Sequence, residues 1–190
     1  MNFLAHLWLA EKTKTSFAGA ILGDIARGAD LSAYPDEIER GIRLHRKIDA
    51  ATDRHPLSVA ARERFGQGRR RYAGIVMDLV CDHILASDWS RYSDEALPDF
   101  CLRASNDIEQ AGPWFIHAGG RAIEAQGFSK LLISYAGPAG IEYAIGRTAN
   151  RMRDSQPLIE AAKGWERVAE EFRPSLPELL NALRGTHPTD

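Results

Sequence analysis

Apolar residues recur every three to four positions along most of the chain, and no segment sustains the alternation of apolar and polar residues that half-buried strands show. Valine, which is enriched in strands, occurs at only four positions. The pattern predicts an all-α fold, a single helical bundle. We expect its helices over residues 3–11, 16–27, 36–53, 57–65, 70–89, 94–117, 128–136, 139–153, 156–172 and 176–184.

Small polar residues, glycine and proline mark the ends of these helices. Asn2 and Ser16 are suited to cap the first two helices, and Ser175 begins a capping box that Glu178 completes. A helix is disfavoured at the residue before proline, and glycine is common just after a helix. Breaks are therefore predicted at 55–56, 112–113 and 137–138, and a loop or short helix over 119–127.

Charge and composition narrow the class of protein. The 190 residues carry 24 Lys and Arg against 26 Asp and Glu, so the chain lacks the positive field of a dedicated nucleic-acid binder. Cys81 and Cys101 belong to no C-x-x-C pair, which favours reduced, buried thiols. The apolar opening MNFLAHLWLA is too short to span a bilayer. We expect a soluble, cytoplasmic protein that binds neither nucleic acid nor membrane; the sequence does not indicate its oligomeric state.

The apolar helix over residues 70–89 contains acids where a core is expected. Asp78 and Asp82 stand four positions apart among apolar neighbours, and His83 follows. Side chains at this spacing share a helix face with Cβ atoms about 5–6 Å apart, so the two carboxylates repel each other unless a cation lies between them. Gly74, one turn earlier, leaves room for that cation. We interpret the pair as a divalent-metal site; the alternative is a solvated acidic stripe.

A second column of polar residues lies on the helix over residues 36–53. His45, Asp49 and Asp53 recur every four positions and therefore share one face. Imidazole together with carboxylate suits Mn, Fe or Zn, whereas carboxylates alone suit Mg. The alternative is an outward polar face held by ion pairs, such as Asp49 with Arg46.

Two further polar residues interrupt apolar stretches nearer the start of the chain. Asp24 follows Gly23, which allows another group to approach the backbone closely, and the alternative role of Asp24 is an ion pair with Arg27. His6 stands in the first apolar helix, where a hydrogen-bonded core histidine is the common alternative. Because four separate helices each carry such a residue, the sequence predicts a carboxylate–histidine metal centre between helices.

Arginines accompany these polar residues. Arg43 and Arg46 flank the His45 column, and Arg71 ends a run of three arginines over 69–71. Such a run is usually a solvated surface segment. Guanidinium groups also hold phosphate through paired hydrogen bonds, or dock an acidic macromolecule, and the sequence leaves these roles open.

Four segments together resemble the acyl carrier protein phosphodiesterase family. They are MNFLAHLWLA, the GD of LGDIARG, GIRLHRKIDAATDRHP, and RRYAGIVMDLVCDHIL with the tryptophan that follows it. The match is close over residues 1–90, and the second half fits in length and helical character. The resemblance implies an all-helical fold distantly related to the HD phosphohydrolase domain. It also implies a divalent metal, usually Mn²⁺ with Mg²⁺, Fe²⁺ or Co²⁺ as alternatives, and removal of the 4′-phosphopantetheine arm from holo acyl carrier protein.

The resemblance places the family's motif acids and histidines on residues of this chain. These are His6, Asp24, His45, Asp49, Asp53, Asp78, Asp82 and His83. The resulting hypothesis assigns to the metal His6, Asp24, His45, Asp78 and Asp82. It assigns to catalysis Asp49, His83, Arg46 and Asp53, and to binding of the phosphopantetheine phosphate Arg43 and Arg71.

In this hypothesis a carboxylate, Asp49 or Asp82, accepts a proton from the attacking water, and His83 or His45 protonates the leaving serine oxygen. Asp82 precedes His83, which reverses the order of the HD dyad. Asp88 stands where the family often has a histidine before the tryptophan. The reversed order argues against a direct transfer of the HD dyad's roles to Asp82 and His83. The aspartate at position 88 argues against a role for the family's histidine at that position.

Two other functions are compatible with the sequence. An HD-like hydrolase of a nucleotide or another small phosphate ester would use the same kind of centre. A non-catalytic helical module that binds a carrier protein would hold its polar residues as buried ion pairs and would need no metal. In the favoured interpretation, residues 1–190 form one phosphodiesterase domain.

Overall fold

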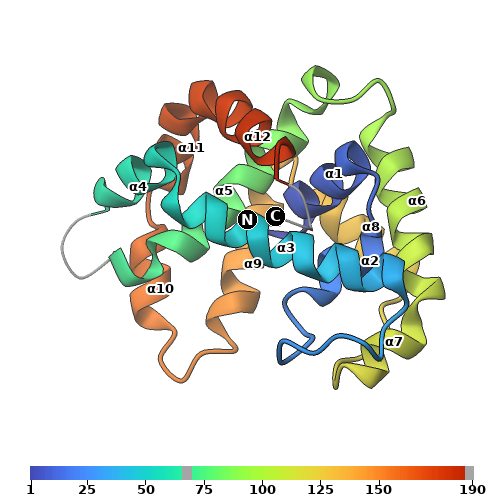
Figure 1. Cartoon of the computed structure of the whole chain (residues 1–190). Coiled ribbons are helices and arrows are strands. Elements are labelled where there is room, and N and C mark those ends of the chain that lie inside the picture. Colours follow the sequence, from blue (N-terminus) through green and yellow to red (C-terminus); the bar gives the residue numbers. More distant parts are fainter. Residues whose placement is uncertain (66–69, 187–190) are drawn as a thin grey trace.

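The computed structural model describes residues 1–65 and 70–186 (Figure 1). Helices and turns make up this part of the chain, and no strand occurs in it, so the all-α prediction is confirmed. The likeness to an HD domain stays a prediction. The helices are α1 (Phe3–Thr13), α2 (Phe17–Leu22), α3 (Asp36–Arg54), α4 (Pro56–Glu63), α5 (Arg70–Ser87), η1 (Trp89–Arg91), α6 (Leu97–Gln110), α7 (Gly112–His117), α8 (Ala125–Ser134), α9 (Pro138–Ala149), α10 (Gln156–Ala162), α11 (Trp165–Phe172), η2 (Arg173–Ser175) and α12 (Leu176–Arg184).

Local sequence signals set many helix ends. The Ser16 side chain accepts a hydrogen bond from the backbone N–H of Gly19, so the predicted cap of α2 is confirmed. His55 ends α3 with extended backbone before Pro56, and its ring accepts from the N–H of Leu57 at the start of α4. Proline occupies the first turn of α4, α6, α7, α9, α10 and α12, where a missing N–H leaves no bond unmade.

Long-range contacts move other ends away from the predicted positions. The helix predicted over 16–27 ends at Leu22. The guanidinium of Arg46, on α3, donates hydrogen bonds of 2.7 Å to the carbonyl oxygens of Ala26 and Gly28. These two carbonyls therefore bond to a side chain and not to N–H groups of a continued α2. A side chain on a distant helix therefore holds the segment after α2 as a turn.

The C-terminal helices also differ from the prediction. The helix predicted over 156–172 is divided into α10 and α11, because Gly164 adopts a left-handed φ of 75°. The predicted capping box is wrong: Ser175 ends η2, and its side chain makes no capping hydrogen bond to α12. Neither difference reaches the polar residues singled out above.

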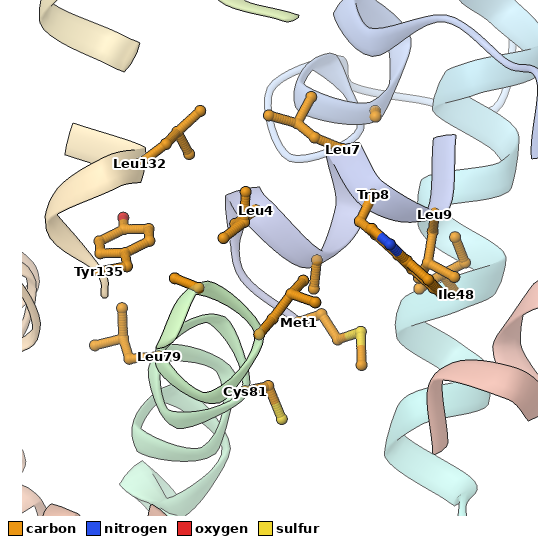
Figure 2. Packing of buried hydrophobic residues seen from close by; sticks show 14 of the residues in the cluster. Met1, Leu4, Leu7, Trp8, Leu9, Ile48, Leu79, Cys81, Leu132 and Tyr135 are labelled. Atoms are coloured by element: carbon orange, nitrogen blue, oxygen red, sulfur yellow. The ribbon is translucent and has the colours of Figure 1, made fainter. Parts of the chain in front are cut away.

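Helix α1 packs against several other helices. Its residues from Leu4 to Ala10 are all buried, and it contacts α2, α3, α5 and α12. Figure 2 shows its side chains between Ile48 of α3, Leu79 of α5 and Tyr135 at the end of α8. Each fully buried large apolar side chain stabilises the fold by roughly 1.5–3 kcal/mol. Because α1 has no solvated face over this stretch, His6 must find its polar partners inside the protein.

Two other expectations can be compared with the fold. Cys81 and Cys101 are buried and free of any disulfide. Over residues 1–65 and 70–186, no helix combines the length and the apolar character that crossing a bilayer requires.

Candidate metal centre

Glycines bring α2 and α3 into close contact. A Cβ atom on Gly19 would lie 2.6 Å from the carbonyl oxygen of Ile38 and 2.7 Å from Cα of Gly41. Both distances are far below van der Waals contact, so this interface excludes a side chain on either glycine. The contact brings the backbone of α2 against the face of α3 that carries His45.

The end of α2 fixes the orientation of the His45 imidazole. Its Nδ1 donates a hydrogen bond of 2.6 Å to the carbonyl oxygen of Ala20, and the side chain is buried. A Cβ atom on Gly23 would lie 2.1 Å from Cγ of His45, so the close approach expected at this glycine is made by the imidazole. Because the backbone uses Nδ1, Nε2 is the nitrogen available to a ligand.

Two carboxylates meet at this nitrogen, and a second imidazole lies beside them. Nε2 of His45 lies 3.2 Å from Oδ1 of Asp24 and 3.2 Å from Oδ2 of Asp49. The other oxygen of Asp49 lies 3.0 Å from Nε2 of His6. The rings of His6 and His45 stack with centroids 3.9 Å apart. We call these four residues, which come from α1, the turn after α2, and α3, the His45 cluster.

The cluster favours positive charge between its carboxylates. Burial alone would lower the pKa of His45, but its bonds to Asp24 and Asp49 outweigh burial and raise the pKa to about 9. Burial lowers the pKa of His6 to about 4, because the bond to Asp49 does not offset the lost hydration. Burial would raise the pKa of Asp49, yet the bonds to both imidazoles hold it well below its usual range. A proton on His45 or a divalent cation supplies the required charge.

The donor atoms of His6, His45 and Asp49 all lie within 4.8 Å of one another. Two imidazoles and one carboxylate at this spacing fit a divalent metal ion. The buried Nδ1 of His6 has no hydrogen-bond partner among the described residues, whereas its Nε2 lies 3.0 Å from Asp49. The Asp24 side chain is 56% exposed and borders the triad on the solvent side.

Asp78 lies at the edge of the His45 cluster. The amino group of Met1 is 3.1 Å from Oδ1 of Asp78 and 3.3 Å from Oδ1 of Asp49, so one ammonium joins the two carboxylates. Burial raises the pKa of Asp78, and the nearby ammonium opposes that effect. The role of Asp78 as a metal ligand stays a prediction.

Asp82, in contrast, has both oxygens occupied by the backbone. It is completely buried and accepts hydrogen bonds of 2.9 Å from the N–H groups of Leu4 and Ala5. It thus caps α1 from α5. Asn2 occupies the predicted N-cap position of α1, but its side chain makes no capping hydrogen bond. Asn2 donates instead to the hydroxyl of Tyr135. The structure does not bring Asp82 to the His45 cluster.

His83 also lies outside the cluster. Its Nδ1 donates a 2.8 Å hydrogen bond to the carbonyl oxygen of Tyr135, and its ring meets that of Trp165 edge-on at 4.9 Å. This is the environment of a buried structural histidine. The roles of Asp82 as a ligand and of His83 as a proton donor stay predictions that these contacts do not support.

The other predicted catalytic residues serve neighbouring helices. Asp53 is exposed and forms an ion pair of 2.5 Å with Arg62 of α4. Arg46 binds the two carbonyls of the turn after α2, and this turn carries Asp24. Arg46 therefore positions one wall of the cluster, whereas Asp53 contacts no member of it.

The predicted phosphate-binding arginines are placed only in part. Arg43 is exposed and forms an ion pair of 2.6 Å with Glu39, one turn away on α3. Arg69 lies outside the described residues, and only the backbone of Arg71 is described. The role of the arginine run therefore stays a prediction.

Sequence reasoning missed two groups next to the cluster. The carbonyl of Ala20 orients His45, and the amino group of Met1 joins Asp49 to Asp78. Both are backbone or terminal groups that every chain has, so no residue type marks them. Only the packing of α1 and α2 against α3 shows that they matter.

The fold and the cluster define an all-helical protein with a buried imidazole–carboxylate centre suited to a divalent metal. The chain belongs to the acyl carrier protein phosphodiesterase family, whose model matches residues 1–183. The match thus includes the second half of the chain, in which no specific motif of the family was recognised.

Curated relatives carry the same family name. The acyl carrier protein phosphodiesterase of Photorhabdus laumondii is 34% identical over 168 residues, which is 86% of this chain and 81% of the relative. That of Enterobacter sp. (strain 638) is 40% identical over 60% of this chain and 59% of the relative. That of Yersinia pestis is 42% identical over 57% and 56% respectively. No solved structure shows a significant match to this chain.

Proposed function

We propose that this protein hydrolyses the phosphodiester between the 4′-phosphopantetheine arm and the serine of holo acyl carrier protein. The products are the apo protein and free phosphopantetheine. Membership of the family supports this activity. The observation that carries the proposal is the convergence of the donor atoms of His6, His45 and Asp49 within 4.8 Å. We further propose that one domain performs the reaction in the cytoplasm, which the free thiols of Cys81 and Cys101 support.

The chemistry of the donors supports Mn²⁺ as the cofactor. His6, His45 and Asp49 would hold the ion, because mixed nitrogen and oxygen ligands suit Mn²⁺ better than Mg²⁺. A divalent ion at this position supplies a Lewis acid beside the scissile phosphate. The hydrogen bond from Nδ1 of His45 to Ala20 keeps its Nε2 directed at the ligand position.

Other residues of the chain would orient the reactants. Asp24 is the most solvent-exposed acid of the His45 cluster, so it is placed to accept a proton from a water that attacks phosphorus. Arg46 holds the turn that carries Asp24 and so fixes the position of that carboxylate. The bond that breaks joins phosphorus to the serine oxygen, which takes up a proton as the apo protein leaves.

Mass spectrometry of holo carrier protein incubated with this protein tests the proposal. With Mn²⁺ we expect the carrier protein to lose the mass of the arm, and EDTA to prevent the loss. A His45→Ala variant serves as the matched negative control. Intact holo protein after incubation with a metal-loaded enzyme would refute the proposal. A panel of nucleotides and small phosphodiesters then tests the alternative HD-like activity.

A further inference from the structure

A pocket of about 790 Å³ opens beside the His45 cluster, and residues from the second half of the chain form much of its wall. Asp24 borders both the pocket and the cluster. The volume falls within the range of about 300–1,000 Å³ that is typical of small-molecule sites. The large apolar side chains of the wall are those of Phe3, Ile21, Ile25, Ile123, Phe128 and Leu131.

A smaller pocket of about 140 Å³ lies beside the large pocket, and its wall includes Leu79 of α5. Both are bordered by Phe3, Asp24, Leu131, Arg147 and Arg151. The two pockets therefore lie side by side, and the wall that they share includes a carboxylate of the candidate metal centre. A substrate whose phosphate lies at Asp24 could extend along these pockets without entering the core.

Arg121 borders the large pocket alone, whereas two other arginines border both pockets. Arg147, near the end of α9, and Arg151, just after it, border both pockets, and neither pairs with a carboxylate among the residues that the structure describes. Arg147 lies over the ring of Tyr143, with its guanidinium carbon 5.8 Å from the centroid. Arg43, Arg62 and Arg103, in contrast, each pair with an acid. Unpaired guanidinium groups beside an apolar wall suit an anion attached to a partly apolar chain.

The acid in the pocket wall other than Asp24 is already engaged. The two oxygens of Glu124 accept hydrogen bonds from the N–H groups of Gln126 and Gly127 and cap α8. Glu124 keeps its negative charge, but its oxygens are directed at the first turn of α8, and no ion pair joins it to Arg147 or Arg151 among the described residues.

We propose that this pocket binds the 4′-phosphopantetheine arm, with Arg147 and Arg151 holding its phosphate and the apolar wall contacting its methyl and methylene groups. The inference rests on the proposed function and assigns it a substrate subsite. It also gives the second half of the chain a task, because the His45 cluster lies entirely within the first half. Arg147 and Arg151 act here as phosphate-binding residues that touch the substrate.

Titration calorimetry of the Mn²⁺-loaded protein tests the phosphate contact. The probes are 4′-phosphopantetheine and pantetheine, which differ only in the phosphate. We expect Arg147→Gln combined with Arg151→Gln to weaken phosphopantetheine binding by about tenfold or more and to leave pantetheine binding unchanged. Arg153→Gln is the matched control, since Arg153 is exposed nearby and borders neither pocket; it should leave both affinities unchanged.

The variant Ile25→Ala tests the apolar contact. It should weaken the binding of pantetheine and of phosphopantetheine by roughly three- to tenfold, because it removes buried apolar area from the arm, and it should leave the affinity for inorganic phosphate unchanged. Circular dichroism of each variant shows whether the fold is retained.

The outcomes separate this inference from the proposed function. The pocket assignment is wrong if the protein hydrolyses holo carrier protein but neither the arginine substitutions nor the Ile25 substitution changes its affinity for the arm. The proposed function is retained in that case. If phosphopantetheine binds in a manner that depends on the two arginines but holo carrier protein is not hydrolysed, the pocket assignment is supported and the proposed function is wrong.

Discussion

Two groups of polar residues interrupt the apolar helices of this protein, and they are used differently. In the His45 cluster the side chains of α1, α3 and the turn after α2 face one another, with donor atoms about 3 Å apart. Around Asp82 the partners are backbone groups: both oxygens accept N–H bonds from α1, and His83 donates to a carbonyl. The sequence presents the two groups as equivalent, since both place Asp and His among apolar neighbours.

The two groups differ in how their polar atoms are satisfied, and this difference separates a candidate metal centre from polar residues that only stabilise the fold. Asp82 is completely buried, and each of its oxygens accepts a hydrogen bond from an N–H group in the first turn of α1, so its contacts are those of a helix cap. The His45 cluster instead retains one buried ring nitrogen without a partner, on His6, and a half-exposed carboxylate, on Asp24. The candidate metal centre therefore differs from the helix cap in having polar atoms whose hydrogen-bonding or ligating sites no other group of the protein occupies.

The largest expected effect comes from His45→Ala. Loss of the imidazole removes a ligand at the centre of the cluster, so hydrolysis of holo carrier protein should fall on the order of 10³–10⁴-fold. Addition of Mn²⁺ at 100 times its Kd should stabilise the wild type by about 2.7 kcal/mol and this variant hardly at all. Rates and thermal melts measure both. His117→Ala is the control, because His117 is exposed and its ring meets those of Tyr34 and Trp114, which are not part of the His45 cluster. A similar loss of activity in this control would show that the effect is not specific to His45.

Asp82→Asn addresses the other group. The amide keeps one acceptor oxygen but presents an NH₂ group to one of the two N–H donors of α1, so the free energy of unfolding should fall by about 2–3 kcal/mol. Chemical denaturation gives this value, and calorimetry should show unchanged Mn²⁺ affinity in the folded protein. If this variant loses Mn²⁺ binding while its stability is unchanged, Asp82 is a metal ligand and the two groups of polar residues do not differ in function.

Gly23→Ala tests whether the backbone positions His45. The added Cβ would lie 2.1 Å from Cγ of the imidazole, so the ring must move and Mn²⁺ affinity should fall by about 10–100-fold. Gly74→Ala is the matched control, because nothing lies within 4 Å of its would-be Cβ. Alanine is the better helix former, so this control should raise stability slightly. Equal Mn²⁺ affinities in the two variants would contradict the positioning role of Gly23.

The smallest expected effect is that of Ser16→Ala. Removal of the hydroxyl that caps α2 should cost about 1 kcal/mol of stability, which a shift of the denaturation midpoint would show. Because the α2–α3 contact depends on Gly19 and Gly41, the Mn²⁺ affinity should stay within about twofold of the wild type. A large change in affinity would mean that the cap, and not only the packing, places His45.

Local sequence determined the all-helical fold, the proline-marked helix starts and the cap at Ser16, because each depends on residues within one helical turn. It also singled out His6, Asp24, His45 and Asp49, because a polar side chain among apolar residues is expected to be buried and then requires a polar partner or an ion. Tertiary structure alone decided that these four meet while Asp82 caps a helix, and that Arg147 and Arg151 border the same pockets as Asp24. The physical reason is that a polar side chain's role depends on which partners satisfy it, and here those partners come from helices distant in the sequence, packed together by the apolar core.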